Sequence, residues 1–251
     1  MTMGRTSKVY FMSPRASTGN VALSYVSKGQ RLFDAAGLNE CFKKGDRVAI
    51  KAHCGEWNNT GYLRPSIVAG IVEKVKEYGG EPFVTDTTTL IYGSRLGRVI
   101  AQDMYKTAAR NGYNEATLGA PFVVADGDYG LDDVKVKIDG NFLNYAYVAR
   151  AIADADAMIA VTHFKGHTTG VYGGAIKNLG IGCTSKRGKT ATHMMTSPIY
   201  GIGAKWPFHP EKCRGKDCIS YQTCLELCPV RAVKLKETPP YIEWDRKKCV
   251  G

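Results

Sequence analysis

Short apolar runs rich in β-branched residues alternate with amphipathic stretches as far as residue 161, and this alternation limits the folds open to the chain. We expect strands at residues 9–12, 47–52, 82–85, 121–125, 134–138 and 157–161. Helical patterns lie at residues 32–42, 66–78, 96–111 and 144–155. Strands that alternate with helices predict an α/β fold with a mainly parallel sheet flanked by helices.

Polar residues follow three of the expected strands: His53, Asp86 and His163. Ligands of open parallel sheets bind at the carboxyl ends of the strands, so these positions are candidates for a site. Beside His53, Cys54 and Glu56 are further metal or acid/base candidates, although their spacing matches no standard zinc motif. We therefore treat His53 as a candidate catalytic residue.

Residues 162–183 combine histidines, lysines and several glycines directly after the last expected strand. The candidate catalytic side chains in this segment are His163, Lys165, His167 and Lys177. Gly173 and Gly174 are candidate cofactor-binding residues, because a glycine-rich helix start lets backbone N–H groups approach an anion. The alternative is a turn kept only for packing. The basic run at 186–189 either extends this site or forms a solvated loop.

Five cysteines at metal-ligand spacing close the sequence: Cys213, Cys218, Cys224, Cys228 and Cys249. The Cys-x3-Cys-Pro ending at Cys228 is typical of bacterial ferredoxins, in which the fourth cysteine of each motif ligates the other cluster. We expect two 4Fe-4S clusters in a full-length form and incomplete ligand sets in these 251 residues. The spacing before Cys224 is looser than in the usual motif. The proline- and glycine-rich stretch at 197–210 divides an α/β domain (1–200) from this partial ferredoxin-like cysteine module (201–251).

The formal net charge of +11 is concentrated near the cysteines, since residues 184–251 hold thirteen basic and six acidic residues. This charge offsets anionic clusters or attracts an acidic redox partner such as a ferredoxin or flavodoxin. Nucleic acid is disfavoured as a partner because no nucleic-acid-binding motif accompanies the charge. The chain shows neither a run of 18 apolar residues nor a secretory signal, so we expect a reducing, cytoplasmic setting without membrane contact. Cys41, Cys54 and Cys183 are expected to be small buried residues.

The segment HFKGH…GGAIKNLGIGC, followed by GKTATHMM and the cysteines, resembles the uncharacterised Fe–S-centre protein family. The resemblance covers essentially the whole chain. It implies a domain of unknown function joined to a two-cluster ferredoxin module. A weaker similarity links the chain to the nickel-dependent lactate racemase superfamily, in which a histidine segment also precedes a Gly-Gly-x-Lys helix start. That similarity implies that His163 and Lys177 lie at an active site between two α/β lobes.

Three functions remain open from the sequence. The first is an iron–sulfur electron-transfer protein or oxidoreductase that delivers electrons to a small-molecule substrate at the His/Lys/Gly-rich site. The second is a non-redox acid/base enzyme, an isomerase or racemase of a small hydroxy or carboxylic acid, with structural clusters. The third is a partner-docking module without chemistry. The cysteine pattern favours the first.

Overall fold

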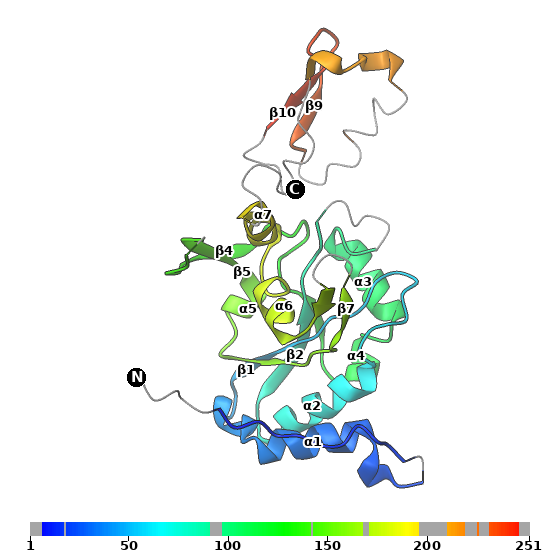
Figure 1. Cartoon of the computed structure of the whole chain (residues 1–251), viewed down its shortest axis with the longest axis vertical. Coiled ribbons are helices and arrows are strands. Elements are labelled where there is room, and N and C mark those ends of the chain that lie inside the picture. The colour runs from blue at the N-terminus through cyan, green and yellow to red at the C-terminus, as the bar shows by residue number, and fades with distance from the viewer. Residues whose placement is uncertain are drawn as a thin grey trace.

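The computed structural model describes residues 7–17, 19–90, 97–141, 143–167, 171–195, 210–218, 225 and 231–245, with the backbone alone for 193–195. The described residues up to 195 are called the body, and the body is built on a four-stranded sheet (Figure 1). The strands are β1 (Arg47–Lys51), β2 (Glu81–Asp86), β3 (Phe122–Val124) and β6 (Ala157–Ala160). Their order is β3-β2-β1-β6, and every neighbouring pair is parallel. The predicted α/β fold with a parallel sheet is therefore confirmed.

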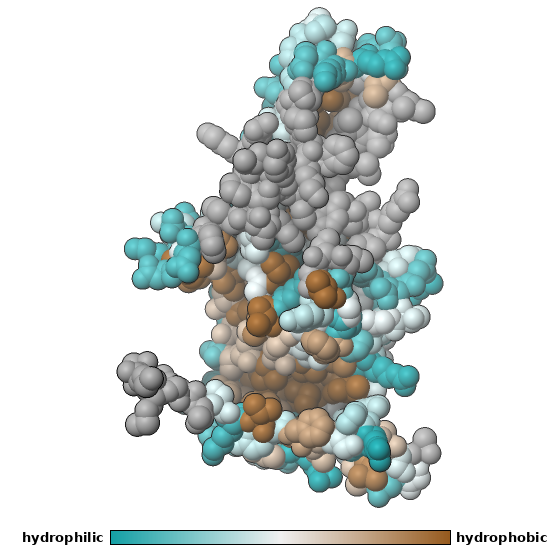
Figure 2. Space-filling view, in the orientation of Figure 1, coloured by the Kyte–Doolittle hydropathy of each residue, from teal (hydrophilic) through white to brown (hydrophobic). Residues whose placement is uncertain are grey.

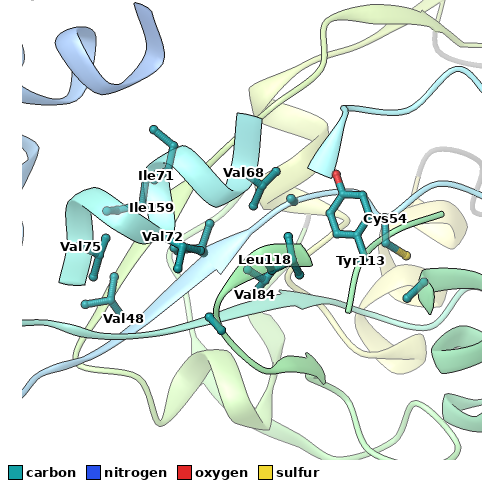
Figure 3. Close-up of a cluster of buried hydrophobic side chains, with 14 of the residues drawn as sticks. Val48, Cys54, Val68, Ile71, Val72, Val75, Val84, Tyr113, Leu118 and Ile159 are labelled. Atoms are coloured by element: carbon teal, nitrogen blue, oxygen red, sulfur yellow. The ribbon is translucent and has the colours of Figure 1, made fainter. Parts of the chain in front are cut away.

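The main core lies between the sheet and α2 (Pro65–Glu77) (Figure 3). Pro65 begins this helix at a position where its missing N–H costs nothing. Val68, Val72 and Val75 recur at helical spacing and are buried against the strands, and burial of each stabilises the fold by about 1.5 kcal/mol or more. The predicted helix at 66–78 is thus confirmed. Helices α3 (Ala101–Arg110) and α4 (Glu115–Leu118) border the same core.

Helix α1 (Tyr25–Ala35) packs against α2, and the two lie side by side in Figure 1. Gly70 makes the close approach between them feasible, because a Cβ there would lie 2.7 Å from the side chain of Val26. Ser24 caps the start of α1 by accepting a hydrogen bond from the backbone N–H of Ser27. The 3-10 turns η1 (Val21–Leu23) and η2 (Leu38–Cys41) lie on either side of α1 in the sequence.

A second, smaller core joins the elements that follow β3. Its buried residues are Ala125, Ala149, Ile152 and Cys183. The antiparallel pair β4 (Asp133–Lys137) and β5 (Tyr145–Ala149) leads into α5 (Arg150–Ala153). After β6 come the hairpin of β7 (Lys165–His167) and β8 (Val171–Gly173), then α6 (Ala175–Gly180) and α7 (Lys186–Met195). Asn178 of α6 contacts Lys51, and Lys189 of α7 contacts Thr87, so these two helices lie at the carboxyl ends of β1 and β2.

Several predicted elements differ from the structure. Residues 9–12 form no strand, and Val9 and Phe11 are exposed rather than packed in a sheet. The chain directly after them is held by the Lys28 ammonium, which donates to the carbonyls of residues 13 and 15. The predicted helix at 144–155 is β5 plus the single turn α5, since this segment pairs with β4. The helix predicted at 32–42 ends at Ala35, before Gly37 takes the left-handed conformation with φ of 66°. The helix predicted at 96–111 begins only at Ala101.

Beyond the body, the structure describes η4 (Pro210–Lys212), η5 (Gly215–Asp217) and an antiparallel pair, β9 (Val233–Leu235) with β10 (Ile242–Trp244). The predicted boundary at 197–210 lies almost wholly outside the described residues, so the division into 1–200 and 201–251 stays a prediction. Among the helices described, none has the length and apolar character needed to cross a membrane.

Candidate functional site

The strand order creates a switch point between β1 and β6. From β1 the chain adds β2 and then β3 on one side, whereas β6 is added on the other side. In open α/β sheets, ligands bind in the crevice outside the carboxyl ends of the strands at such a point. Lys51 ends β1, Asp86 ends β2 and Thr162 follows β6, so polar residues meet at the place where the topology predicts a site.

Asp86 is the centre of this polar cluster and is almost completely buried. Its Oδ1 accepts hydrogen bonds from Lys51 Nζ at 2.9 Å and from the backbone N–H of Thr87 at 2.9 Å. Its Oδ2 faces His53 Nδ1 at 3.2 Å and the backbone N–H of Cys54 at 3.3 Å. Burial alone would raise the pKa of this carboxyl, but Lys51, His53 and a neighbouring arginine hold it well below its usual range. Asp86 is therefore a carboxylate that orients the groups around it.

Asn178 of α6 bridges the two sides of the switch point. Its Oδ1 accepts from Lys51 Nζ at 2.8 Å, and its Nδ2 donates to Thr162 Oγ1 at 2.9 Å. The chain returns past this contact at Gly182, where a Cβ would lie 2.9 Å from Lys51 Nζ and 2.3 Å from the backbone oxygen of Asn178. Glycine is thus needed at 182 for α6 to close over the strand ends.

His53 is held so that one ring nitrogen stays available for chemistry. The carboxylate of Asp86 can only accept, so the 3.2 Å contact places the hydrogen on Nδ1 and leaves the lone pair on Nε2. The backbone N–H of Gly55 lies farther from Nδ1, at 3.4 Å. The side chain is 30% exposed. Burial, aided by the positive charge of Arg98, lowers the pKa of His53, so the ring is neutral at neutral pH.

Arg98 and Glu56 form an ion pair beside this histidine, with 2.7 Å between Nη2 and Oε1. Arg98 Nη1 also lies 3.9 Å from Asp86 Oδ2. The Nε atom of Arg98 is buried and has no hydrogen-bond acceptor among the described residues. A buried N–H without an acceptor is costly, so this atom lacks a partner that the described residues do not supply.

The β7–β8 hairpin brings Lys165 and His167 to the same region as Lys177 of α6. The hairpin register pairs Lys165 with Gly173, and a Cβ on Gly173 would lie 3.8 Å from the Cδ atom of Lys177. Burial and the positive charges of Lys165 and Arg98 lower the pKa of Lys177. Burial and the two lysines also lower the pKa of His167, whereas Glu56 acts in the opposite direction on both groups. These side chains therefore share one electrostatic environment with the Arg98–Glu56 pair.

The other face of the hairpin is apolar and exposed. Phe164 and Tyr172 pack ring against ring at 5.5 Å between centroids, and Ile176 on α6 is 90% exposed. Figure 2 shows apolar side chains on the face of the molecule that carries α6 and β7. His163 is exposed at the base of this hairpin. Of the five predicted catalytic residues, His53 lies at the strand ends and His163 is exposed. The other three, Lys165, His167 and Lys177, lie within the electrostatic influence of the residues beside His53.

Gly173 is buried and Gly174 caps the start of α6, as expected for a strand-to-helix turn, while their role in binding a cofactor stays a prediction. Sequence reasoning missed Lys51, Arg98 and Asn178 as site residues. The signal for Lys51 was present in the sequence, since it is a charged residue within the apolar strand run RVAIKA. Arg98 and Asn178 carry no comparable local signal.

A second buried polar cluster lies at the end of β3, and it changes the interpretation of the basic run at 186–189. That run is not a solvated loop, because α7 buries Lys186 and Lys189. Lys189 Nζ donates to Thr87 Oγ1 at 2.8 Å and lies 3.9 Å from Asp126 Oδ2. Burial lowers the pKa of each of the two lysines to about 8. Thr87 connects this cluster to Asp86.

The cysteines divide into two groups. Cys54 and Cys183 are buried as predicted, and burial raises the pKa of each thiol, whereas Cys41 is exposed and contradicts the prediction. Cys213 and Cys218 are free and half-buried; Cys224, Cys228 and Cys249 lie outside the described residues. Two thiols are half of the ligands of a four-iron cluster, and no group of three or more metal-binding side chains occurs in the described part of the chain.

Comparison with known proteins places these features in a family. The chain matches a family described as Domain of unknown function (DUF362) over residues 48–232, in agreement with the domain of unknown function expected from the sequence. The Thylakoid-associated protein sll1697 of Synechocystis sp. is 29% identical over 163 residues, which cover 63% of this chain and 45% of that protein. The chain therefore spans less than half the length of this relative. No solved structure matches it.

Proposed function

This chain belongs to the DUF362 family, a domain of unknown function, and we propose that its α/β body is an acid/base enzyme that removes a proton from a small anionic substrate. The observation that carries the proposal is the contact between Asp86 and His53 at the carboxyl ends of the strands. A histidine oriented by a buried carboxylate, with its second nitrogen available, is the usual arrangement of a general base.

The surrounding side chains fit this role. In the proposed reaction, His53 Nε2 takes the proton from a carbon next to a carbonyl or carboxyl group, and the electron pair of the broken C–H bond stays on the substrate. The ammonium groups of Lys165 and Lys177 hold the substrate's anionic oxygens and stabilise the added negative charge. Return of the proton to another face or position gives the product. The reaction class is that of an isomerase or racemase of a small hydroxy or carboxylic acid.

Hydrogen exchange at carbon tests the proposal without knowledge of the product. The protein is incubated in D2O with a panel of small oxo- and hydroxycarboxylates, and the loss of C–H signals is followed by NMR. We expect exchange with wild type and a loss of at least about a hundredfold in His53→Gln, as for removal of a general base. Lys135→Gln, which changes an exposed lysine of β4 that contacts Tyr145, serves as the control and keeps the wild-type rate. Exchange that persists in His53→Gln would refute the role of His53.

The pH dependence gives a second readout. Because the pKa of His53 is lowered from its ordinary value of about 6.5, the base is already unprotonated at neutral pH. We expect the exchange rate to be constant around neutral pH and to fall as the solution is acidified below the ordinary histidine pKa of about 6.5. A rate that still rises between about pH 7 and 8 would contradict this assignment.

A second candidate function is the iron–sulfur redox activity that the cysteine spacing predicts, with 4Fe-4S clusters and an acidic ferredoxin or flavodoxin as partner. The observation in its favour is that Cys213 and Cys218 are both free thiols. A reducing, cytoplasmic compartment fits this function, since the ligands have to remain reduced. Anaerobic reconstitution with iron and sulfide should give a visible absorption band and an EPR signal on reduction, both diminished in Cys218→Ser and unchanged in Cys41→Ser. Absence of both signals in wild type would exclude this function for the chain.

A further inference from the structure

The charges at the site do not cancel. Lys51 is compensated by Asp86 and Arg98 by Glu56, through ion pairs of 2.9 and 2.7 Å. His53 is neutral at neutral pH, so it adds no charge there. The ammonium groups of Lys165 and Lys177 remain, and the described residues place no carboxylate within 4.0 Å of either. The site therefore carries two positive charges that the described side chains do not compensate.

The sequence around Lys165 and Lys177 contains no carboxylate that could compensate their two positive charges. Between Asp156 and Glu211 the chain has six lysine and arginine residues and no acidic residue. The hairpin register and the approach of Lys177 to Gly173 hold the two lysines on the same face, although like charges repel. A protein keeps such an arrangement at a cost in stability, which a bound anion relieves.

A directional donor, Arg98, lies close enough to Lys177 for its positive charge to lower the pKa of that lysine. Arg98 Nε is buried without an acceptor in the described chain, and its guanidinium is fixed by Glu56. An arginine held in this way binds carboxylate or phosphate oxygens in a defined geometry, whereas a lysine acts as a point charge.

We propose that the site binds a dianion, a small molecule with two negative charges, with Lys165 and Lys177 as the compensating cations and Arg98 as the orienting donor. This inference rests on the proposed function and narrows its substrate class from any small anion to dicarboxylates or phosphate-bearing acids. The two sources share the same recognition chemistry, and the experiment separates them.

Calorimetric titration at constant ionic strength tests the proposal with succinate, inorganic phosphate and acetate as probes. We expect at least one of the two dianions to bind about tenfold or more tightly than acetate, because a second ion pair in a partly buried site adds at least that factor. Tighter succinate binding identifies dicarboxylates, and tighter phosphate binding identifies phosphate-bearing acids. Equal affinities for all three probes would overturn the proposal.

Substitution of Lys165 and of Lys177 tests whether these two side chains bind the dianion. Lys177→Gln and Lys165→Gln should each weaken dianion binding about tenfold and reduce the preference over acetate, while the control Lys135→Gln changes neither. Circular dichroism verifies that each variant is folded. Dianion affinity that is unchanged in both site variants would refute the assignment. His53→Gln should retain dianion binding while losing exchange at carbon, so failure of the proposed base and failure of the dianion site give different results.

Discussion

Replacement of Asp86 by asparagine is the most direct test of how the strand ends are held together. The substitution keeps the size of the side chain but removes its charge. The amide oxygen of the new side chain would still accept from Lys51 Nζ and from the backbone N–H of Thr87. Its amide nitrogen would then face His53 Nδ1 and the backbone N–H of Cys54, which are donors in the wild-type structure. The variant thus leaves the buried ammonium group of Lys51 without a compensating negative charge. It also places the amide N–H donors of the new side chain opposite the N–H donors of His53 and Cys54.

The expected cost follows from these contacts. Loss of one partner of a buried ion pair destabilises a protein by about 3–5 kcal/mol. For a body of this size, that corresponds to a fall in Tm of about 6–20 °C. The matched control is Asp154→Asn, because Asp154 is half exposed and lies 3.9 Å from Arg150 on the surface. An exposed pair of this kind contributes about 1 kcal/mol or less.

Urea unfolding followed by circular dichroism measures both variants, at neutral pH and in acid. The pKa of Asp86 is lower in the folded than in the unfolded chain, so its stabilising contribution is present above about pH 4 and is lost as the pH falls through the lowered value. The difference between wild type and Asp86→Asn should therefore narrow in strong acid. A variant that loses no more stability than Asp154→Asn would refute the central role of Asp86.

Two further predictions concern the surroundings of this pair. Gly182→Ala should destabilise the body by about 1–3 kcal/mol, because the added Cβ would overlap the backbone oxygen of Asn178. Gly166→Ala is the control, since its added Cβ meets open space. Equal Tm values for the two variants would contradict closure of the strand ends by α6. The pKa of Lys189 is lowered to about 8 in the folded chain, so the unfolded chain binds more protons than the folded chain between about pH 8 and 10. The free energy of unfolding of wild type should therefore rise over that range by up to about 3 kcal/mol. Lys189→Met should reduce this rise in urea unfolding curves, and an identical rise in the variant would disprove the assignment.

The parts of the fold that the sequence predicts well are those set by local patterns. Helix α2 has a proline at its start and valines at helical spacing, and β1 is an apolar run bounded by polar residues. The segment 145–149 has no such decisive pattern. Its Tyr-Ala-Tyr-Val-Ala sequence suits a helix or a strand, and its pairing with β4 decides the outcome. The helix prediction failed there because a non-local contact overrode local preference.

The same distinction applies to the site. His53 and Asp86 were recognisable as polar strand ends, and the parallel sheet brings them into contact. The burial of Lys51 depends on Asp86, 35 residues later, and on Asn178, 127 residues later. Lys189 resembled a solvated lysine because its partner Asp126 is distant in the sequence. Pairings of this length cannot be derived from local composition.

The central position of β1 also sets the order in which the body can assemble during synthesis. β1 pairs on one side with β2 but on the other with β6, and the backbone N–H of Arg47 donates to Asp156, 109 residues later. At about 5–20 residues per second, a ribosome takes about 5–20 s to cover that distance, and during this time the apolar strand remains an unpaired edge open to aggregation. Asn178 emerges later still. The strand ends therefore close only after β6 and α6 have emerged.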